Sequence, residues 1–280
     1  MNEVLKQFDL SGKIAAITGG GGELCGAMAE ALGLMGVRVA VLDIAADKAE
    51  RRAESLRNRG GTATAVCCDV LDPSRVRKSY ETVSGLWGPP DILINGAGGN
   101  DARGSTSSEF HELGLAGEQT FFDLDPSAFR HVFDLNFFST FLVTQTFSRG
   151  MVGKGAGSIV NISSMSAFRP LTKVGSYSAA KASVSNFTQW LAVHLAHTGV
   201  RVNALAPGFF LTEQLRFLHF DAKTGQPSPR AKQVIQHTPM GRYGEPDDLI
   251  GALVWLLSDA SRFVTGAVVP VDGGFSCYAL

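Results

Sequence analysis

The stretch Lys13-Ile-Ala-Ala-Ile-Thr18-Gly19-Gly20-Gly21-Gly22-Glu23-Leu-Cys-Gly-Ala-Met-Ala-Glu-Ala-Leu32 contains three local structures in succession. Its short apolar run predicts a buried strand, its glycines predict a tight loop, and the residues from Glu23 onward predict a helix. In this order, the N–H groups of the loop and the N-terminus of the helix can hold a pyrophosphate. The stretch therefore predicts the first unit of a dinucleotide-binding α/β fold.

A carboxylate ends the next apolar run, Arg38-Val-Ala-Val-Leu-Asp43, 24 residues after Gly19. An acidic side chain near this distance, at the end of the second strand, suits the ribose 2′-hydroxyl of NAD and repels the 2′-phosphate of NADP. We therefore expect NAD as the cofactor. The alternative is a flexible glycine turn followed by an aspartate that is only solvated.

The rest of the chain alternates apolar runs with helical patterns and shows no internal repeat. Strands are expected at Ile14–Thr18, Arg38–Asp43, Thr62–Cys67, Asp91–Asn95, Ser158–Ile162, Arg201–Ala206 and Ala267–Val271. Helices are expected at Glu23–Met35, Asp47–Arg59, Pro73–Trp87, Pro126–Arg149, Ser176–His197 and Pro246–Leu257. This alternation predicts an α/β fold over residues 1–280: one Rossmann-type doubly wound domain with a seven-stranded parallel sheet and helices on both faces.

Two long segments, 99–124 and 209–240, interrupt the alternation after the fourth and sixth expected strands. Loops of this length in a compact domain are usually lids, binding loops or disordered insertions. Because ligands of open α/β sheets bind at the carboxyl ends of the strands, we expect both segments to serve as substrate loops. For the first segment, a surface decoration of an oligomer is the alternative.

Composition and charge argue against several classes of function. The 280 residues are 45% hydrophobic and 18% charged, which is ordinary for a globular protein. A formal net charge of −1 gives no electrostatic reason to expect nucleic acid or a membrane as partner. The first residues lack the pattern of a signal peptide, and apolar runs of about eight residues, such as Ile250–Leu257, are too short to span a bilayer.

Cysteine and histidine spacing indicates neither a disulfide framework nor a zinc site. The four cysteines are Cys25, Cys67, Cys68 and Cys277, and the six histidines are scattered. We therefore expect no metal and a reducing, cytoplasmic setting.

Tyr177 and Lys181 stand four residues apart in Tyr177-Ser-Ala-Ala-Lys181, so on a helix they share one face. A phenol with a pKa near 10 is a poor proton donor at pH 7 unless a nearby cation favours the phenolate. The pair therefore indicates a tuned general acid/base. The hydroxyl of Ser164, 13 residues before Tyr177, could hold the reacting oxygen.

Taken in order, these motifs resemble the short-chain dehydrogenase/reductase family from about Phe8 to Phe275. The markers are Thr18-Gly19 with its glycine loop, Cys68-Asp69-Val70, Asn95-Gly96-Ala97-Gly98, Asn136, Ile162-Ser163-Ser164, Tyr177 with Lys181, and Pro207-Gly208 with Thr212. The resemblance implies an NAD(H)-dependent enzyme that acts on a CH–OH group. It also implies a homo-oligomer, a tetramer or dimer, formed through the helices at Pro126–Arg149 and Ser176–His197.

By this resemblance the catalytic residues are Asn136, Ser164, Tyr177 and Lys181. Ser164 would donate a hydrogen bond to the substrate oxygen and Tyr177 would deliver the proton. Lys181 would lower the pKa of the tyrosine and bind the nicotinamide ribose, while Asn136 would hold a water that links Lys181 to solvent. Ser163 competes with Ser164, but the offset from Tyr177 favours Ser164.

The resemblance also implies contacts along the whole cofactor. Asp69 would meet the adenine, Asn95 to Gly98 would line the adenine ribose, and Pro207 to Thr212 would hold the nicotinamide end. The full set is Gly19, Gly21, Gly22, Leu24, Asp43, Ile44, Asp69, Val70, Asn95, Ala97, Gly98, Tyr177, Lys181, Pro207, Gly208, Phe210 and Thr212. The family pattern T-G-x-x-x-G-x-G has Glu23 and Cys25 in place of its second and third glycines. A residue other than glycine at either place narrows the backbone conformations open to the loop.

Several stretches resemble the D-mannonate oxidoreductase (fructuronate reductase) branch of the family. They are Gly96–Asn100, Thr120–Asp125, Ser164–Leu171, Ser185–Trp190, Pro207–Glu213 and His237–Met240. The substrate implied is a small polyhydroxy acid, D-mannonate, which is interconverted with its keto-acid. The alternatives are a polyol or sugar-acid dehydrogenase of the gluconate type, a 3-oxoacyl carrier reductase, and a catalytically silent nucleotide-binding regulator.

A polyhydroxy acid needs a cation for its carboxylate, and arginine can supply one in a bidentate manner. Arg169 lies in the segment that joins Ser164 to Tyr177, so we expect it to be the anchor, with Lys173 and Arg103 as further candidates. The expected substrate-binding residues are Ser164, Ser166, Arg169 and Tyr177. A salt bridge at a helix end or an interface is the alternative for Arg169.

Overall fold

A seven-stranded, all-parallel sheet forms the centre of the molecule, in the order β3-β2-β1-β4-β5-β6-β7. The structure, a computed structural model, describes residues 3–113, 117–212, 215–216, 219–221 and 224–279. The strands are β1 (Ile14–Thr18), β2 (Arg38–Asp43), β3 (Thr62–Cys67), β4 (Ile92–Asn95), β5 (Gly157–Ile162), β6 (Val200–Pro207) and β7 (Val268–Val271). The predicted fold class is confirmed, and every strand lies within one residue of its predicted bounds.

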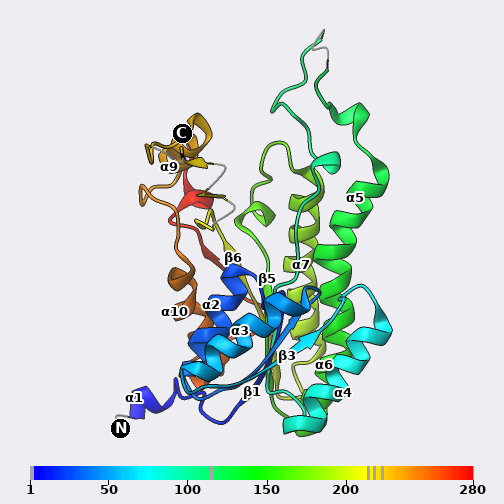
Figure 1. Ribbon diagram of the computed structural model, residues 1–280, viewed down its shortest axis with the longest axis vertical. Helices are drawn as coiled ribbons and strands as arrows, with labels where there is room; N and C mark the ends of the chain where they lie inside the picture. The colour runs from blue at the N-terminus through cyan, green and yellow to red at the C-terminus, as the bar shows by residue number, and fades with distance from the viewer. Residues whose placement is uncertain (1–2, 114–116, 213–214, 217–218, 222–223, 280) are drawn as a thin grey trace.

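Helices cover both faces of the sheet (Figure 1). One face carries α2 (Glu23–Leu34), α3 (Ala46–Asn58) and α10 (Ile250–Leu257), and the other carries α4 (Pro73–Trp87), α6 (Ser139–Lys154) and α7 (Gly175–His194). Each face has its own apolar core: Met28 and Leu253 belong to the first, and Phe147 and Leu191 to the second. Because the central strands are buried on both faces, they are continuous apolar runs, as β1 shows with all five residues buried.

The strand order reverses between β1 and β4, which pair with each other although two other strands separate them in the chain. Such a reversal opens a crevice at the carboxyl ends of the strands. Gly19 stands at this point with φ of +65°, and a Cβ there would lie 3.0 Å from the backbone of Ala97. A glycine is therefore required where the turn after β1 meets the turn after β4.

The helix expected at Pro126–Arg149 is three pieces. It consists of α5 (Pro126–Phe133), a π-helical turn at Asp134–Phe138, and α6, which extends to Lys154. Likewise, the helix expected from Pro246 begins with a 3-10 turn, Pro246–Leu249, before α10. Apolar periodicity cannot distinguish these variants from a regular helix, and π turns occur frequently at functional sites.

The segment 209–240 is not a simple loop, because it contains α9 (Pro229–His237). Ser228 caps this helix by accepting a hydrogen bond from the Ala231 N–H at 3.2 Å, and Pro229 occupies its first turn. A serine followed by proline is a helix-start signal. The sequence therefore carried the signal, and the expectation of a loop was wrong for these residues.

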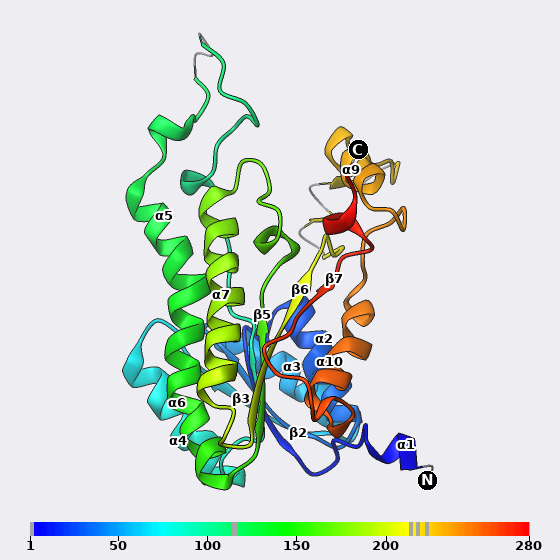
Figure 2. The same cartoon turned by 180° about the vertical axis from the view of Figure 1, so that it is seen from behind.

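Residues 99–113 and 117–124, which we call the arm, project beyond the carboxyl ends of the strands (Figures 1 and 2). The arm contains two short 3-10 turns, Ala102–Gly104 and Phe121–Asp123. Its two sides are joined where the Ser107 N–H donates to the Gln119 carbonyl at 2.9 Å. Among the helices described, none is long and apolar enough to cross a membrane.

Candidate active site

A cavity of about 360 Å³ lies at the carboxyl ends of β1, β2, β3 and β4. It collects nine of the residues predicted to bind the cofactor, and these are Gly19, Gly22, Leu24, Asp43, Ile44, Asp69, Val70, Ala97 and Gly98. Residues from four separate turns therefore converge on one cavity, which is what an elongated nucleotide requires.

Asp43 is tied into the glycine loop. Its Oδ2 accepts a hydrogen bond from the Gly21 N–H at 3.0 Å, and its Oδ1 accepts one from the Ala45 N–H at 2.9 Å. Lys48 lines the same cavity from the first turn of α3. A Cβ at Gly21 would lie 2.7 Å from Lys48 Cβ and 3.0 Å from Asp43 Oδ2, so this glycine lets the acid and the lysine approach the loop.

The two unusual residues of the glycine loop are accommodated differently. Cys25 is buried, and its Sγ fills the space opposite Gly96, where an added Cβ would lie 2.1 Å from the sulfur. Burial raises the pKa of this thiol to about 12, so it remains protonated. Glu23 begins α2 and lines a neighbouring cavity together with Lys48, Arg51 and Arg52. Glu23 therefore shares a cavity with three cationic residues and is not among the residues that line the nucleotide cavity.

Tyr177, Lys181 and Ser164 come together above β5. Tyr177 is in the first turn of α7 and Lys181 is one turn later, with its Nζ 5.6 Å from the centre of the tyrosine ring. Ser164 follows β5, is 6% exposed, and accepts a hydrogen bond from the Ser166 N–H at 3.1 Å. Helix α7 packs against the 3-10 turn Met165–Ala167 that Ser164 caps, which brings the hydroxyl beside the phenol.

Ser163 is engaged elsewhere. Its hydroxyl donates to the Lys181 carbonyl at 3.1 Å and lies 2.7 Å from the Ser185 hydroxyl, and the residue is 1% exposed. It therefore has a structural use in attaching β5 to α7. Of the two adjacent serines, Ser164 is the one beside Tyr177.

Burial dominates the pKa values of the acid/base pair. The pKa of Tyr177 is raised by burial, an effect that the hydrogen bond with the Ser164 hydroxyl opposes. The pKa of Lys181 is lowered by burial to about 8. The net direction for Tyr177 is upward because loss of solvent disfavours the phenolate more than the Ser164 hydroxyl favours it. The lowering of this pKa by Lys181 stays a prediction.

Asn136 lies in the π turn and is fully buried. Its Nδ2 donates to the Gly99 and Val132 carbonyls, each at 2.7 Å, and its Oδ1 accepts from the Gly99 N–H at 3.3 Å. An added Cβ at Gly98 would lie 2.6 Å from Asn136 Oδ1 and 3.4 Å from Lys181 Nζ. The amide and the ammonium therefore flank one glycine at the end of β4.

Several predicted cofactor residues lie outside the nucleotide cavity. The buried Asn95 side chain donates to Thr144 Oγ1 and Asn161 Oδ1, each at 2.8 Å, so it joins β4 to β5 and α6. Gly21 and Thr212 line the neighbouring cavity that holds Glu23. At the nicotinamide end, Pro207 terminates β6 and the Gly208 N–H donates to the Val271 carbonyl at 3.0 Å.

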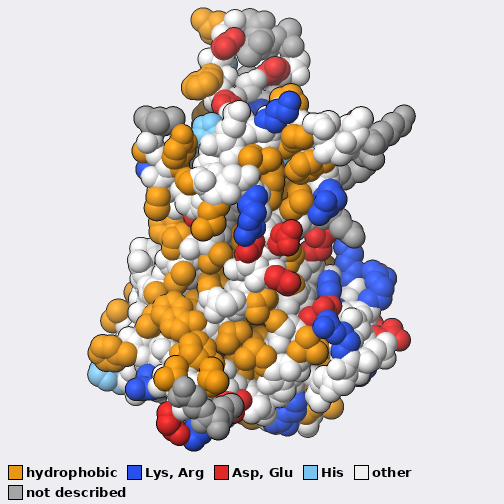
Figure 3. Space-filling view, turned by 90° about the vertical axis from the view of Figure 1, so that its left-hand side faces the viewer, with side chains coloured by type: hydrophobic (Ala, Val, Ile, Leu, Met, Phe, Trp, Pro, Cys, Tyr) orange, Lys and Arg blue, Asp and Glu red, His pale blue; other side chains and the backbone are white. Residues whose placement is uncertain are grey.

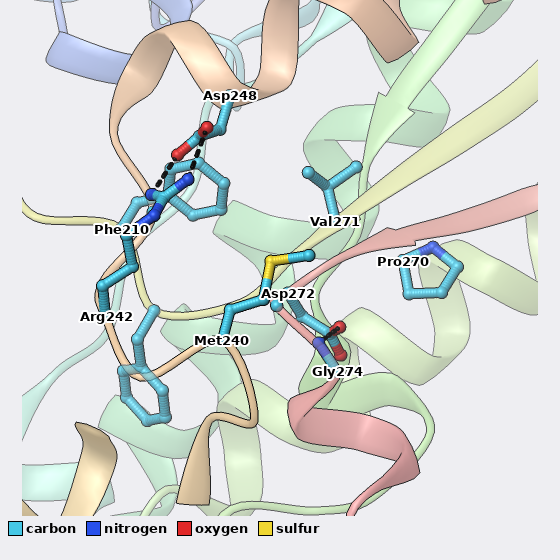
Figure 4. A pocket seen from close by; sticks show the side chains of 11 residues that line it. Phe210, Met240, Arg242, Asp248, Pro270, Val271, Asp272 and Gly274 are labelled. Carbon is cyan, nitrogen blue, oxygen red and sulfur yellow. Dashed lines mark hydrogen bonds and ion pairs between the residues drawn. The ribbon is translucent and has the colours of Figure 1, made fainter. Parts of the chain in front are cut away.

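Phe210 lines a third cavity, of about 410 Å³ (Figure 4). Its ring packs against Gly244, where an added Cβ would lie 2.8 Å from it. Arg242 and Asp248 form a bidentate ion pair in the same cavity, at 2.6 and 2.9 Å. The Phe210 side chain therefore belongs to this cavity and to the core, and any contact with the cofactor would come from its backbone.

The predicted carboxylate anchor is already engaged, because Arg169 Nη1 donates to the Tyr278 carbonyl at 2.8 Å and so holds the C-terminal segment. Arg103 is paired with Asp101 at 2.8 Å and with Asp125 at 3.3 Å. Ser166 is 2% exposed, and its Oγ has no hydrogen-bond partner among the described residues. Within the same described part of the chain, no group of His, Cys, Asp and Glu could hold a metal ion.

Sequence reasoning missed four residues that line the nucleotide cavity, namely Cys25, Lys48, Cys68 and Leu135. Two of them adjoin predicted residues, Cys68 beside Asp69 and Leu135 beside Asn136. Lys48 could have been found from its place one helical turn after the end of β2. Cys25 was noticed only as a departure from the glycine pattern.

Comparisons with known proteins agree with this architecture. The family profile described as enoyl-(acyl carrier protein) reductase matches residues 24–276. An uncharacterised oxidoreductase of Bacillus subtilis is 48% identical over 273 residues, which cover 97% of each chain. A crystal structure from Haemophilus influenzae, provisionally assigned as a D-mannonate oxidoreductase and with bound NAD, is 46% identical, covers 97% of each chain, and has a TM-score of 0.92.

A more distant structure is a gluconate 5-dehydrogenase from Burkholderia cenocepacia in complex with NADP and tartrate. It is 30% identical, covers 99% of this chain and all of that one, and has a TM-score of 0.84. The chain belongs to the short-chain dehydrogenase/reductase family and is an oxidoreductase of CH–OH groups.

Proposed function

We propose that this enzyme interconverts D-mannonate and D-fructuronate with NAD(H), using Tyr177 as the general acid/base. The observation that carries the proposal is the placement of Tyr177 and Lys181, 5.6 Å apart from ring centre to Nζ, with the Ser164 hydroxyl beside the phenol. A developing alkoxide or carbonyl oxygen needs donors at this point. A phenol and a hydroxyl on adjoining elements supply them.

In the oxidation direction, Ser164 donates a hydrogen bond to the substrate hydroxyl oxygen, and Tyr177 takes the hydroxyl proton as the C–H hydride departs. NAD supplies the hydride acceptor. Lys181 favours the phenolate and carries the proton onward, and Asn136 holds a water beside it. In the reverse direction, Tyr177 returns the proton to the carbonyl oxygen.

The chain's residues fit the cofactor. The nucleotide cavity is built on glycines where side chains would collide, as at Gly19 and Gly96, and it contains the Asp43 carboxylate. A carboxylate at the end of β2 favours a free ribose 2′-hydroxyl. The Haemophilus relative holds NAD, which supports the same choice here.

The choice of substrate is supported by the names of two relatives. The Haemophilus relative is provisionally assigned to D-mannonate, and the Burkholderia relative acts on gluconate. Both names denote sugar acids, so a sugar acid is the substrate class that they favour. A gluconate-type acid is the alternative, and the Burkholderia relative, similar over 99% of this chain, is the observation that favours it.

The enzyme is also proposed to be a homo-oligomer, a tetramer or dimer. Large apolar side chains are exposed on the helical face formed by α5, α6 and α7, including Trp190 at 57% and Val193 at 78%. Figure 3 shows a second gathering of hydrophobic side chains on another face of the molecule. Phe263, which follows α10 in the chain, is fully exposed. Exposed apolar patches of this kind mark interfaces between proteins.

The experiment is to follow NADH formation with the purified enzyme across D-mannonate, D-gluconate, other hexonates and the matching alditols. The proposal requires D-mannonate to have the highest kcat/KM, and D-fructuronate to be reduced with NADH. A preference for gluconate would select the alternative. Oxidation of alditols alone would exclude a sugar acid as substrate.

A further inference from the structure

Glu109 joins three segments that follow three neighbouring strands. Its Oε1 accepts a hydrogen bond from Thr172 Oγ1 at 3.2 Å and pairs with Arg230 Nη1 at 3.4 Å. Glu109 belongs to the arm after β4, Thr172 to the segment between β5 and α7, and Arg230 to α9 after β6. Figures 1 and 2 both show the arm and α9 on opposite sides of the segment that precedes α7, above the carboxyl ends of β5 and β6.

This contact lies on the side of the sheet where a substrate is expected to bind. Ligands of open α/β sheets bind beyond the carboxyl ends of the strands, and Thr172 is only five residues before Tyr177. The next residue, Lys173, has a φ of +73°, and its carbonyl accepts the Thr106 N–H of the arm at 2.9 Å. Among the described residues it is the only non-glycine with positive φ, and backbone strain of this kind clusters at ligand sites.

Three other arginines around the site already have partners. Arg242 makes a bidentate pair with Asp248, Arg103 contacts two aspartates, and Arg169 binds the Tyr278 carbonyl. Arg103 and Arg242 would have to surrender a short charged hydrogen bond to receive a substrate carboxylate, and Arg169 is held through Nη1 by a backbone carbonyl of the C-terminal segment.

Arg230 is different, because its pairing is weak. The ion pair with Glu109 is a single 3.4 Å contact between side chains that are 39% and 29% exposed, a type that contributes little to stability. Its contact with Gln233 Oε1, at 3.2 Å, uses the same nitrogen. Nε and Nη2 have no hydrogen-bond partner among the described residues, so the guanidinium can still offer two parallel donors to a carboxylate.

We propose that Arg230 binds the carboxylate of the substrate, and that Glu109 is the counter-ion that the substrate displaces. The inference rests on the proposed sugar-acid substrate and makes Arg230 the residue that distinguishes an acid from an alditol. Before substrate binds, Glu109 holds the guanidinium across the entrance. When the acid enters, one monodentate pair is exchanged for a bidentate one, so the exchange is favourable.

The test compares two variants that remove opposite members of the pair. Arg230→Gln and Glu109→Gln are assayed with D-mannonate and with D-mannitol, which serves as a competitive inhibitor if it is not oxidised. Lys232→Gln, on the same helix, and Glu112→Gln, on the same arm, are matched controls. Both side chains are exposed, and these substitutions remove the same charges as the two test variants. Thermal unfolding of each variant identifies any that does not fold.

Arg230→Gln should lower kcat/KM for the acid by about 10- to 100-fold, mostly through KM, as expected for one lost charged hydrogen-bond pair. The same substitution should change the KM of the alditol, or its inhibition constant if it is not oxidised, by less than about twofold. Glu109→Gln should act in the opposite direction and lower the KM for the acid, because Arg230 loses its competing partner. The two controls should resemble the wild type.

An equal loss on acid and alditol with Arg230→Gln, or no loss on either, would overturn the inference. So would equal losses of acid turnover in both variants, since the pair would then only hold the segments together. If the wild type oxidises no sugar acid, the proposed function itself fails. If it does so and Arg230→Gln keeps the wild-type discrimination between acid and alditol, only the role of Arg230 fails.

Discussion

Lys181 Nζ lies 5.6 Å from the centre of the Tyr177 ring and donates a 2.7 Å hydrogen bond to the carbonyl of Ile162. Burial acts on both groups, raising the pKa of the phenol and lowering that of the ammonium to about 8. Each group is therefore pushed toward its neutral form. Both shifts therefore disfavour a phenolate beside an ammonium.

Replacing Tyr177 with phenylalanine should isolate the proton transfer, because it removes the phenolic oxygen and leaves the ring. General acid/base catalysis contributes roughly 10²- to 10⁴-fold, so turnover should fall by about that factor while NAD binding persists. The measurements are steady-state turnover and NAD titration by fluorescence. Wild-type turnover in this variant would remove Tyr177 from the mechanism.

The lowered pKa of Lys181 also predicts a change of stability with pH. The unfolded lysine keeps its proton up to its ordinary pKa of 10.5, whereas the folded one releases it near 8. Between these values the unfolded state binds more protons, so folding stability from this group rises with pH, by about 1 kcal/mol per pH unit inside the window.

Lys181→Met removes the titrating group, so it serves as the reference for this prediction. Urea unfolding of both proteins from pH 7 to 10 should show the wild type gaining stability relative to the variant above pH 8. A difference that stays constant over this range would mean that the folded and unfolded pKa values of Lys181 are the same.

Coenzyme choice should depend on the balance between Asp43 and Lys48, which line the same cavity. The wild type should prefer NAD, because the carboxylate repels a 2′-phosphate. Asp43→Asn keeps an oxygen for only one of the Gly21 and Ala45 N–H groups, so it removes the charge and one hydrogen bond. Without the charge, the efficiency with NADP should rise on the order of tenfold. Asp43→Ala, which also loses both hydrogen bonds, should weaken NAD as well.

Adding Lys48→Gln to Asp43→Asn should cancel the gain with NADP, because the cation left beside the ribose is then gone. The measurement is kcat/KM with each coenzyme at saturating substrate. Equal efficiencies of NAD and NADP in the wild type would refute the role of Asp43.

Local patterns sufficed to predict most of the fold and the Tyr177–Lys181 pair of the site. The first two strands occur at their predicted bounds because each is a short apolar run ended by a turn or a charge. Tyr177 and Lys181 share a helical face because four residues make one turn. In each case the signal lies within a few consecutive residues.

What could not be predicted depends on contacts distant in sequence. Arg230 and Glu109 are 121 residues apart, and no local pattern connects them. Asn95 was assigned to the cofactor from its motif, yet its amide bonds to Asn161, 66 residues away, within the core. The place of Cys25 depends on Gly96, which lies opposite its sulfur and is 71 residues away in the chain.

Gly98 and Gly99 provide a matched pair for the last prediction. A Cβ at Gly98 would lie 2.6 Å from Asn136 Oδ1 and 3.4 Å from Lys181 Nζ, whereas one at Gly99 would be at an ordinary 3.5 Å from Leu135 Cδ2. Neither glycine has a positive φ, so an alanine strains neither backbone by itself. The difference between the two variants therefore reports on the space between the amide and the ammonium.

Gly98→Ala should displace Asn136 or Lys181, because the nearest contact is shorter than real Cβ atoms tolerate. Overpacking of this kind costs about 1–3 kcal/mol, and a displaced ammonium also weakens support for the Tyr177 phenolate. Turnover should fall at least about tenfold in Gly98→Ala and stay within about threefold of the wild type in Gly99→Ala. Steady-state kinetics and thermal unfolding of both proteins provide the comparison. If the two variants lose activity equally, the close approach of Asn136 and Lys181 at Gly98 has no part in the reaction.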